Sequence, residues 1–455
     1  ARLAIAPPAA PVIETPWRPQ AFGLVIIAAA IIGITGGLVL STFFPRGELA
    51  RYEYHLWRWQ ADTLLDNVFS RAGIGPHPEG DDATRALTEY FRLTSALRAA
   101  LDDDTPDLAL IDTLTNERAT YENDVERLVE ARIHEAVEGA GLTRGLPLFR
   151  DVRFVWPPVD FELTNPPRLL VRSPRHRIAR AGDTLLKNDL SLRDIEQIER
   201  ETDSEDTVSL VVSIGGIAAY PAIVRDDRSY ESLIETASHE WVHHYLAFFP
   251  LGEQWGKGGD AETLNETTAD LAGREIANLI RKAHPVELPR GADGTAPPSA
   301  ARPVDIDFNA EMRKLRLEVD DLLAKGKVDE AEALMDARRR FFNDHGIPIR
   351  RINQAYFAFY GTYAASAASS NPIGPKVDQV WERTKDVGRF LAIMREVRTT
   401  ADLDAALARP PAPPKPQPPA SAPRGAANAT ASASPTAAYT STMAIASLNS
   451  GAMPP

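Results

Sequence analysis

Cysteine is absent from this chain of 455 residues, and histidine is scarce, with nine residues. Without cysteine the chain forms no disulfide and no thiolate metal site, so a transition metal has to be held by histidine and carboxylate side chains. Basic residues are outnumbered, with 50 Lys and Arg against 63 Asp and Glu and a formal net charge of −13. A nucleic-acid binder normally presents a basic patch, and we therefore expect no nucleic-acid partner.

Charge is also missing from residues 22–44, FGLVIIAAAIIGITGGLVLSTFF. A helix over this stretch has about the 20 residues needed to span a bilayer. The alternative, a signal peptide, has a shorter apolar region nearer the N-terminus, followed by a small-residue cleavage site. We therefore predict a single N-terminal transmembrane helix in the lipid bilayer. Gly33 and Gly37 form a GxxxG pattern that favours helix pairing, which would give a homodimer or a larger membrane assembly.

The predicted location is a membrane, with a single pass and the bulk of the chain extracytoplasmic. The arginines do not decide this orientation, because two precede the apolar stretch and three follow it closely. The preference comes from the order of the segments, in which a short N-terminal tail and one span precede a large acidic domain.

Apolar residues recur at three- and four-residue spacing from residue 52 to about 140, which predicts helices separated by breakers such as GIGPHPEGDD. After residue 145 the runs become β-branched. The stretch DTVSLVVSIGGIAAYPAIV predicts two strands joined at Gly215–Gly216, with Pro221 confining the second strand to a sheet edge. Helical patterns then return and include an antiparallel helix pair that turns at Gly326.

Three of the nine histidines lie within ESLIETASHEWVHHYLAFF, residues 231–249. Residues four apart share one face of a helix, so His239 and His243 can direct both imidazoles at one cation. Glu240 is offset by one position and reaches beside the metal as a general base, as in the His-Glu-x-x-His motif. His244 points about 100° away from His243 and is expected off the metal face. The alternative is an amphipathic helix with exposed histidines.

The next predicted helix, LNETTADLAG, supplies the remaining groups of the site. Glu266, Asp270 and Gly273 follow one another at helical spacing on one face. Glu266 can complete a His–His–Glu zinc site that leaves the fourth position open, as in catalytic zinc centres. Asp270 can accept the second ring N–H of a ligand histidine, and Gly273 would let the two helices approach closely. The sequence therefore predicts Zn²⁺ bound by His239, His243 and Glu266.

HEWVH followed by NETTAD resembles the gluzincin zinc metallopeptidases, whose thermolysin-like members carry His-Glu-x-x-His and then Asn-Glu-x-x-x-Asp on the following helix. The resemblance covers roughly residues 205–280 and holds at the level of the clan. It implies that His239, His243 and Glu266 ligate zinc. It also implies that Glu240 is the general base and that Asp270 supports a ligand histidine. The Gly-x-Met-Glu-Asn signature and the Asn-Ala-x-Trp strand of two better-defined families are absent, so no closer family is assigned.

Gluzincins also pair an extended substrate with an edge strand, and GIAAYPAIV stands in the corresponding position of this chain. They stabilise the oxyanion with a Tyr or His from the C-terminal part of the chain. The stretch NQAYFAFYGTY has Tyr356, Tyr360 and Tyr363 along one predicted helix face, and His345 is a further candidate. Aromatic packing in the core is the alternative for each tyrosine. We assign the oxyanion role to Tyr360.

The patterns and the resemblance together predict an α+β fold that is mostly helical, with one transmembrane helix, a helical layer, and a zincin-like domain with a small sheet and active-site helices. Six segments are predicted, in chain order: a short N-terminal tail (1–21), the transmembrane helix (22–44), a helical hairpin or layer (45–144), the zincin-like catalytic core (145–285), a C-terminal helical subdomain (286–408) and a disordered Pro/Ala/Ser-rich tail (409–455).

The predicted function is that of a membrane-anchored zinc metallopeptidase acting on a peptide or protein substrate, with Glu240 as the general base. One alternative is a structural or accessory subunit of a membrane complex that keeps a peptidase-like fold. The helical layer, the GxxxG pattern and the Pro-rich tail favour that alternative. Another alternative is a zinc amidohydrolase acting on a non-peptide substrate, because no feature of the sequence separates peptide from other amide substrates.

Overall fold

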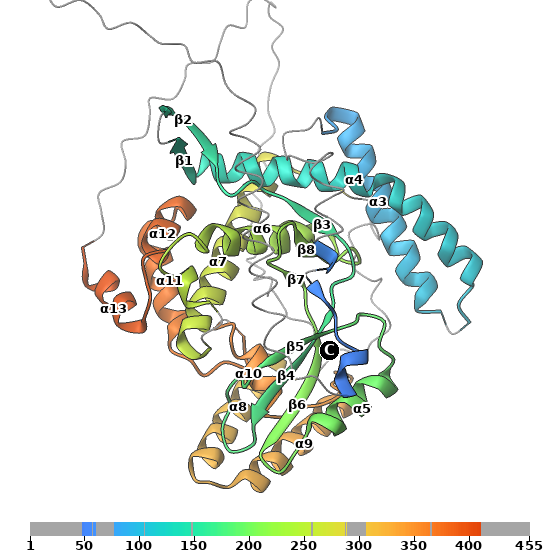
Figure 1. Cartoon of the computed structure of the whole chain (residues 1–455), viewed down its shortest axis with the longest axis vertical. Coiled ribbons are helices and arrows are strands. Elements are labelled where there is room, and N and C mark those ends of the chain that lie inside the picture. The colour runs from blue at the N-terminus through green and yellow to red at the C-terminus, as the bar shows by residue number, and fades with distance from the viewer. Residues whose placement is uncertain are drawn as a thin grey trace, which may run out of the picture.

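The computed structural model describes residues 48–410, apart from 57, 61–76, 104, 147–148, 256–257, 287, 289–305 and 365. Most of the described chain is helical, and its strands form three small sheets (Figure 1). The helices are η1 (Glu48–Arg51), α3 (Gly80–Leu101), α4 (Leu108–Gly139), α5 (Leu192–Thr202), α6 (Tyr230–Leu246), η2 (Gly252–Gln254), α7 (Gly259–Ala283), α8 (Phe308–Ala324), α9 (Val328–Asp344), α10 (Gln354–Tyr360), α11 (Ile373–Thr384), α12 (Val387–Met394) and α13 (Thr400–Ala408). The strands are β1 (Thr143–Leu146), β2 (Phe149–Val155), β3 (Phe161–Leu163), β4 (Arg168–Pro174), β5 (Asp183–Leu186), β6 (Thr207–Ser213), β7 (Gly216–Ile217) and β8 (Ala222–Val224).

The transmembrane helix of the predicted fold class is not supported. Among the described helices, none is both long and apolar enough to cross a membrane. Even the 32-residue helix α4 carries acidic and basic residues along its length, whereas a span requires about 20 predominantly apolar residues. Residues 22–44 themselves lie outside the described residues, as do the predicted tail 1–21 and nearly all of 409–455. The fold class is therefore corrected to a mostly helical α+β chain with small sheets.

The helices α3 and α4 form a hairpin within the segment 45–144, where the sequence predicts a helical layer. Asp107 caps α4, because its side chain accepts hydrogen bonds from the backbone N–H groups of Ala109 and Leu110. The C-terminal half of α4 turns an apolar face toward α6 and α7, and the side chains on that face are fully buried. They are Val125, Val129, Ile133 and Val137.

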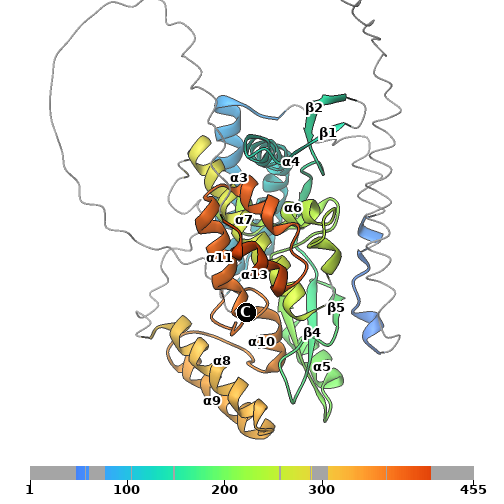
Figure 2. The ribbon, with the colours of Figure 1, turned by 90° about the vertical axis from the view of Figure 1, so that its left-hand side faces the viewer.

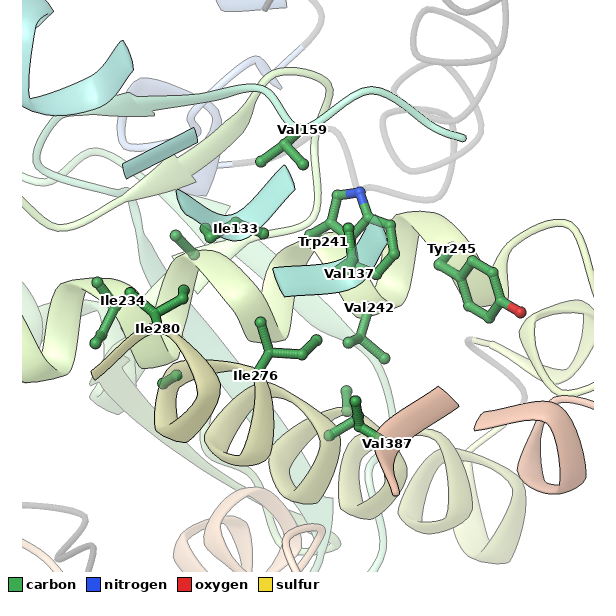
Figure 3. Close-up of a cluster of buried hydrophobic side chains, with 14 of the residues drawn as sticks. Ile133, Val137, Val159, Ile234, Trp241, Val242, Tyr245, Ile276, Ile280 and Val387 are labelled. Atoms are coloured by element: carbon green, nitrogen blue, oxygen red, sulfur yellow. The ribbon is translucent and has the colours of Figure 1, made fainter. Parts of the chain in front are cut away.

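The largest hydrophobic core lies between α4, α6 and α7, and Figure 3 shows its centre. Ile234 of α6 lies there with Ile276 and Ile280 of α7. Trp241 fills the space toward α4, and its indole N–H donates a hydrogen bond to the carbonyl of Pro157 at 3.0 Å. Each large side chain buried in this way contributes about 1.5–3 kcal/mol. The core therefore fixes α6 against α7, the two helices on which the sequence predicts the metal ligands.

The strands form three separate sheets. The pair β1–β2 is antiparallel, β8 lies between β3 (parallel) and β7 (antiparallel), and β4 lies between β5 and β6, antiparallel to both. The predicted break between two strands at Gly215–Gly216 is found, since β6 ends at Ser213 and β7 begins at Gly216, and the two strands belong to different sheets. The predicted edge position of the strand with Pro221 is wrong. Pro221 precedes β8 instead of interrupting it, so β8 is the central strand and β7 is the edge.

A second core joins β4 and β6 to α8, α9 and α10, at the lower end of both views of the ribbon (Figures 1 and 2). The predicted turn of the α8–α9 pair at Gly326 is confirmed. Gly326 has φ of +73°, in the left-handed region that favours glycine. The sheet β5–β4–β6 carries this second core on one face, whereas α5 and a smaller apolar cluster pack on its other side.

Candidate metal centre

Helix α6 begins at a capped N-terminus and carries the motif in its second half. The side chain of Ser229 accepts a hydrogen bond from the backbone N–H of Ser232, which satisfies one of the free donors of the first turn. Most residues of α6 are buried, including Glu240, His243 and His244. Buried polar side chains on a helix require partners, so the surroundings of these three residues decide what the helix can do.

Helix α7 runs antiparallel to α6. Arg281 near its C-terminus pairs with Glu235 at 3.3 Å, and Gly273 in its middle meets His239. A Cβ atom at Gly273 would lie 2.8 Å from the backbone nitrogen of His239 and 2.9 Å from its Cα, which leaves no space for a side chain. The predicted close approach of the two helices at Gly273 is therefore confirmed.

This crossing brings His239, His243 and Glu266 together. The Nε2 atoms of His239 and His243 lie 2.9 Å apart, and Oε2 of Glu266 lies 3.5 Å and 3.6 Å from them. Across the described residues this is the one group of three or more His, Asp or Glu residues that could hold a metal ion, with all ligand atoms within 4.8 Å of one another. The three predicted ligands thus converge on one point.

Glu266 is buried, with 8% of its surface exposed, and its Oε2 atom has no hydrogen-bond partner among the described residues. Burial by itself raises the pKa of Glu266, but His243 and His239 outweigh it and hold the pKa well below its usual range. The carboxylate is therefore charged. A charged, buried oxygen without a hydrogen bond costs several kcal/mol, and a cation between it and the two imidazoles removes that cost. The donor set therefore fits a metal ion.

Asn265, and not Asp270, supports a ligand histidine. The Nδ1–H of His243 donates to Oδ1 of Asn265 at 2.8 Å, and the amide of Asn265 in turn donates to the carbonyl of Leu251 at 3.3 Å. This bond leaves the Nε2 atom of His243 unprotonated, with its lone pair available on the side of Nε2 of His239, which lies 2.9 Å away. Asp270 is partly exposed and pairs with Arg274 of its own helix at 3.9 Å, and among the described residues no hydrogen bond joins it to a histidine.

His239 lies at the more open side of the site. Burial by itself lowers the pKa of His239, but the nearby carboxylates, above all Glu266 and Glu240, outweigh it and raise the pKa to about 9. In His243 burial prevails and lowers the pKa. The raised pKa favours the imidazolium form of His239 near neutrality, next to the carboxylates of Glu266 and Glu240.

Glu240 lies beside this group and is 6% exposed. Burial is the largest cause of a raised pKa in Glu240; His239 lowers it and Glu266 raises it further, with a result of about 7. A carboxylate with a pKa near neutrality can accept a proton and release it again at the same pH. Glu240 therefore has the location and the acidity of a general base.

Tyr363, and not Tyr360, is the tyrosine next to the ligands. Helix α10 ends at Tyr360, which packs against Tyr356 at 4.5 Å between ring centroids in the second core. The chain then turns, and the ring of Tyr363 comes within 6.5 Å of the ring of His239. Glu266, burial and Glu240 raise the pKa of Tyr363 well above its usual value, so its phenol keeps its proton and remains a donor.

His345, the other candidate for the oxyanion role, caps α9 instead. It is exposed, it lies against Phe341 at 4.3 Å between ring centroids, and its Nδ1 contacts the carbonyl of Phe341 at 2.8 Å. These contacts account for the side chain at a helix end, and none of them involves the three ligands.

Two further residues complete the surroundings of the motif. Trp255, in the turn before α7, is 44% exposed and stands edge-on to the ring of His243 at 4.1 Å between centroids. No pattern in the sequence singles it out. His244 points away from the ligands, as predicted, and its Nε2 contacts the carbonyl of Ala219 at 2.5 Å. It thereby ties the loop between β7 and β8 to helix α6.

The chain was compared with protein-family models, with curated proteins and with solved structures, and no match was found in any of the three comparisons. The resemblance of HEWVH and NETTAD to the gluzincins therefore stays a prediction that rests on a short set of residues. The function has to be argued from the site itself.

Proposed function

We propose that this chain is a zinc-dependent metallopeptidase, in which Glu240 is the general base. One observation carries the proposal: two imidazoles and a buried carboxylate without a hydrogen bond at Oε2 converge on one point, and a second buried carboxylate, Glu240, lies beside them on the same helix as the imidazoles. A structural ion pair needs only one carboxylate for its cation. The second carboxylate is what a hydrolase requires.

Zinc is the metal that this donor set suits best. Tetrahedral zinc holds histidine nitrogens and carboxylate oxygens at roughly 2.0–2.1 Å, which separates any two donors by roughly 3.3–3.4 Å. The separations here are 2.9, 3.5 and 3.6 Å, which bracket that value. Three protein ligands leave the fourth position open, as catalytic zinc sites do and structural zinc sites do not.

Glu240 and Asn265 have separate roles in the proposed hydrolysis. When bound, zinc supplies Lewis-acid chemistry, which lowers the pKa of a coordinated water and polarises a carbonyl. Glu240 takes a proton from the attacking water and passes it to the leaving amine, a cycle for which a pKa near the working pH is best suited. Asn265 holds His243 in the tautomer that directs its free lone pair to the metal.

Tyr363 is the group of this chain that suits the oxyanion. Its raised pKa keeps the phenol protonated over the whole working range of a peptidase, so that it donates a hydrogen bond and carries no charge of its own. A neutral donor aimed at developing negative charge stabilises the transition state, and its removal typically costs about 100- to 1,000-fold in kcat.

The edge strand β7 favours a peptide substrate over another amide. Among the described strands it pairs with β8 alone, on one side, and it lies against Glu240. A free strand edge binds an extended peptide backbone through main-chain hydrogen bonds. Such binding would set a peptide bond beside the general base, which a small amide without an extended backbone does not need.

The test is zinc content and peptide hydrolysis of the full chain, measured on the wild type and on two matched variants of α6. We expect one zinc per chain in all three proteins. Glu240→Gln is expected to lose hydrolysis by at least about 100-fold, as removal of a general base does. Glu235→Gln, one turn earlier on the same helix, is the control and is expected to keep wild-type activity, because Glu235 pairs with Arg281 away from the ligands.

Three results would contradict the proposal in different ways. If the purified chain holds no stoichiometric zinc, the proposed metal centre is contradicted. If wild type and Glu240→Gln hydrolyse peptides equally well, the proposed role of Glu240 as general base is contradicted. Full zinc occupancy with no cleavage across a broad peptide library favours the accessory-subunit or non-peptide alternative.

A further inference from the structure

Gly216 is the residue of the edge strand β7 that touches the general base. A Cβ atom at this position would lie 2.5 Å from Oε1 of Glu240 and 3.0 Å from its Cδ. The carboxylate of Glu240 therefore rests directly on the backbone of the strand, in the space that any side chain would fill. The closeness of the two residues does not depend on an unusual backbone conformation, since Gly216 does not have a positive φ.

The neighbouring glycine behaves differently. A Cβ atom at Gly215 would have its nearest neighbour at 4.0 Å, the Cγ2 of Thr236, which is an ordinary van der Waals contact. Gly215 is exposed and likewise lacks a positive φ. The two adjacent glycines thus differ in what a Cβ atom would meet, which is Glu240 and the β8 backbone at Gly216 and only Thr236 at Gly215.

Strand β7 cannot easily move away from Glu240. It pairs with β8 at Gly216↔Val224 and Ile217↔Ile223. The backbone N–H of Arg225 donates to the carbonyl of Gly215 at 3.2 Å, and His244 holds the carbonyl of Ala219 at the other end of the strand. An added methyl group would therefore displace the flexible side chain of Glu240, and it would also press on the backbone of Ile223 in β8.

We propose that Gly216 is a positioning residue for the general base: the bare backbone of β7 at Gly216 sets the location of the Glu240 carboxylate beside the metal ligands. The structural part of this inference concerns the contact itself and holds whether or not the chain is a peptidase. Its consequence for catalysis rests on the proposed function.

The catalytic consequence is a selective loss of kcat. Misplacement of a reacting group by about 1 Å costs on the order of 100-fold in rate. Gly216→Ala is therefore expected to lower kcat by roughly 10- to 100-fold, with zinc content unchanged and KM changed by less than about threefold. Gly215→Ala is expected to keep the wild-type kcat, KM and zinc content.

A methyl group at position 216 would also lie 2.8 Å from the carbonyl oxygen of Ile223, so Gly216→Ala is expected to lower the melting temperature as well. A double-mutant cycle separates the two contacts. The four full-length proteins are the wild type, Gly216→Ala, Glu240→Ala and the double variant, with Gly215→Ala and its double variant as the control cycle. Thermal unfolding is measured without substrate, with and without zinc.

The expected result is that Gly216→Ala lowers the melting temperature less in the Glu240→Ala background than in the wild type, because the shortened side chain leaves room for the methyl group. The control cycle is expected to be additive. If Gly216→Ala alone does not fold, recovery of folded protein in the double variant is the same result. Equal destabilisation in both backgrounds, or failure to recover, overturns the inference.

The Gly216–Glu240 contact and its consequence for catalysis can be contradicted independently of each other. If the cycle shows coupling and no variant hydrolyses peptides, the contact stands and the proposed function falls. If the wild type hydrolyses peptides and Gly216→Ala keeps full kcat, the positioning role falls and the proposed function stands.

Discussion

Two buried glutamates, one in each half of the molecule, are held in opposite ways. Glu199 of α5, 3% exposed, lies beside the β5–β4–β6 sheet, and both of its oxygens are bonded. Oε1 accepts from the backbone of Val211 at 2.7 Å, and the guanidinium groups of Arg350 and Arg351 bind the carboxylate from the other side. Glu266 of α7, 8% exposed, faces two imidazoles instead, and its Oε2 atom is left without a hydrogen bond.

The comparison separates a structural carboxylate from a candidate metal ligand. Both groups have lost their water and both need opposite charge nearby. Around Glu199 the chain itself provides that charge, with permanent cations and a backbone donor. Around Glu266 it provides neutral or titratable nitrogens, which bind a metal ion as well as a proton. The unfilled partner set of Glu266, together with the two converging imidazoles, marks the candidate site, and the complete set around Glu199 indicates a structural role.

The largest effect on stability is expected at Glu199, whose carboxylate has a complete set of partners. Glu199→Ala leaves the partly buried Arg350 without its carboxylate partner and leaves Arg351 with Asp203 alone, and it should lower the free energy of unfolding by about 3–5 kcal/mol. Denaturant unfolding measures the loss, and zinc per folded chain should not change. A loss of zinc at preserved stability would reverse the assignment of the two glutamates.

The reciprocal change is Glu266→Gln. It removes the charged ligand while keeping the side-chain volume, so the zinc dissociation constant should rise by more than about 100-fold, beyond the usual loss when only a residue supporting a ligand is removed. In the metal-free protein the substitution should also lower the unfolding free energy near neutrality, because the lowered pKa of Glu266 and the raised pKa of His239 mean that their pairing stabilises the folded state. Competition with a chelator measures the affinity. Glu275→Gln, on the same helix and bonded to Asn278, is the control.

A smaller effect distinguishes Asn265 from Asp270. Asn265→Ala removes the acceptor of the His243 Nδ1–H and should weaken zinc binding by about 10- to 100-fold. Asp270→Asn should weaken it by less than about threefold, because Asp270 makes no hydrogen bond to a histidine among the described residues. The same chelator competition measures both. The opposite ranking would restore the role that the sequence predicts for Asp270.

The smallest expected effect is on the stability of the folded chain in acid, and it concerns an ion pair near the β5–β4–β6 sheet. Glu332 of α9 binds Arg175 at 2.6 and 2.8 Å. Burial by itself raises the pKa of Glu332, but Arg175 and Gln354 outweigh it and hold the pKa below its usual 4.5. The folded state therefore binds the proton less well than the unfolded state, and the stabilisation is complete above about pH 4.5 and lost as the pH falls through the lowered pKa.

Wild type should accordingly be more stable than Glu332→Gln by up to about 1 kcal/mol near neutrality, since the pair is partly exposed. Urea unfolding at a series of pH values from about 7 to 3 measures the difference. It should shrink toward zero below about pH 4.5. A difference that grows in acid would mean that the pKa of Glu332 is raised.

Local pattern accounts for the parts of the fold and the site that depend on one helix. His239 and His243 share a face because they are four residues apart, and His244 leaves that face for the same reason. The hairpin of α8 and α9 turns at Gly326 because a glycine is the residue best suited to a positive φ there. Gly273 marks the close helix crossing, because the lack of a side chain is visible in the sequence.

Contacts between elements distant in the chain account for the rest. Whether Asn265 or Asp270 meets the Nδ1 of His243 depends on the angle at which α7 crosses α6, and the core of α4 fixes that angle. Tyr363 reaches the ligands because α10 ends at Tyr360, which no spacing predicts. None of the described helices is long and apolar enough to cross a membrane, and the predicted span 22–44 lies outside the described residues.

The sequence by itself determined which residues can act as metal ligands and base, because helical spacing and side-chain chemistry are local properties. Only the tertiary structure decided which neighbours complete the site. The carboxylate of Glu240 lies on Gly216, 24 positions earlier in the chain, because an edge strand and a helix pack against each other. Such packing depends on the shapes of all the elements in the core together, and a single stretch of sequence does not contain it.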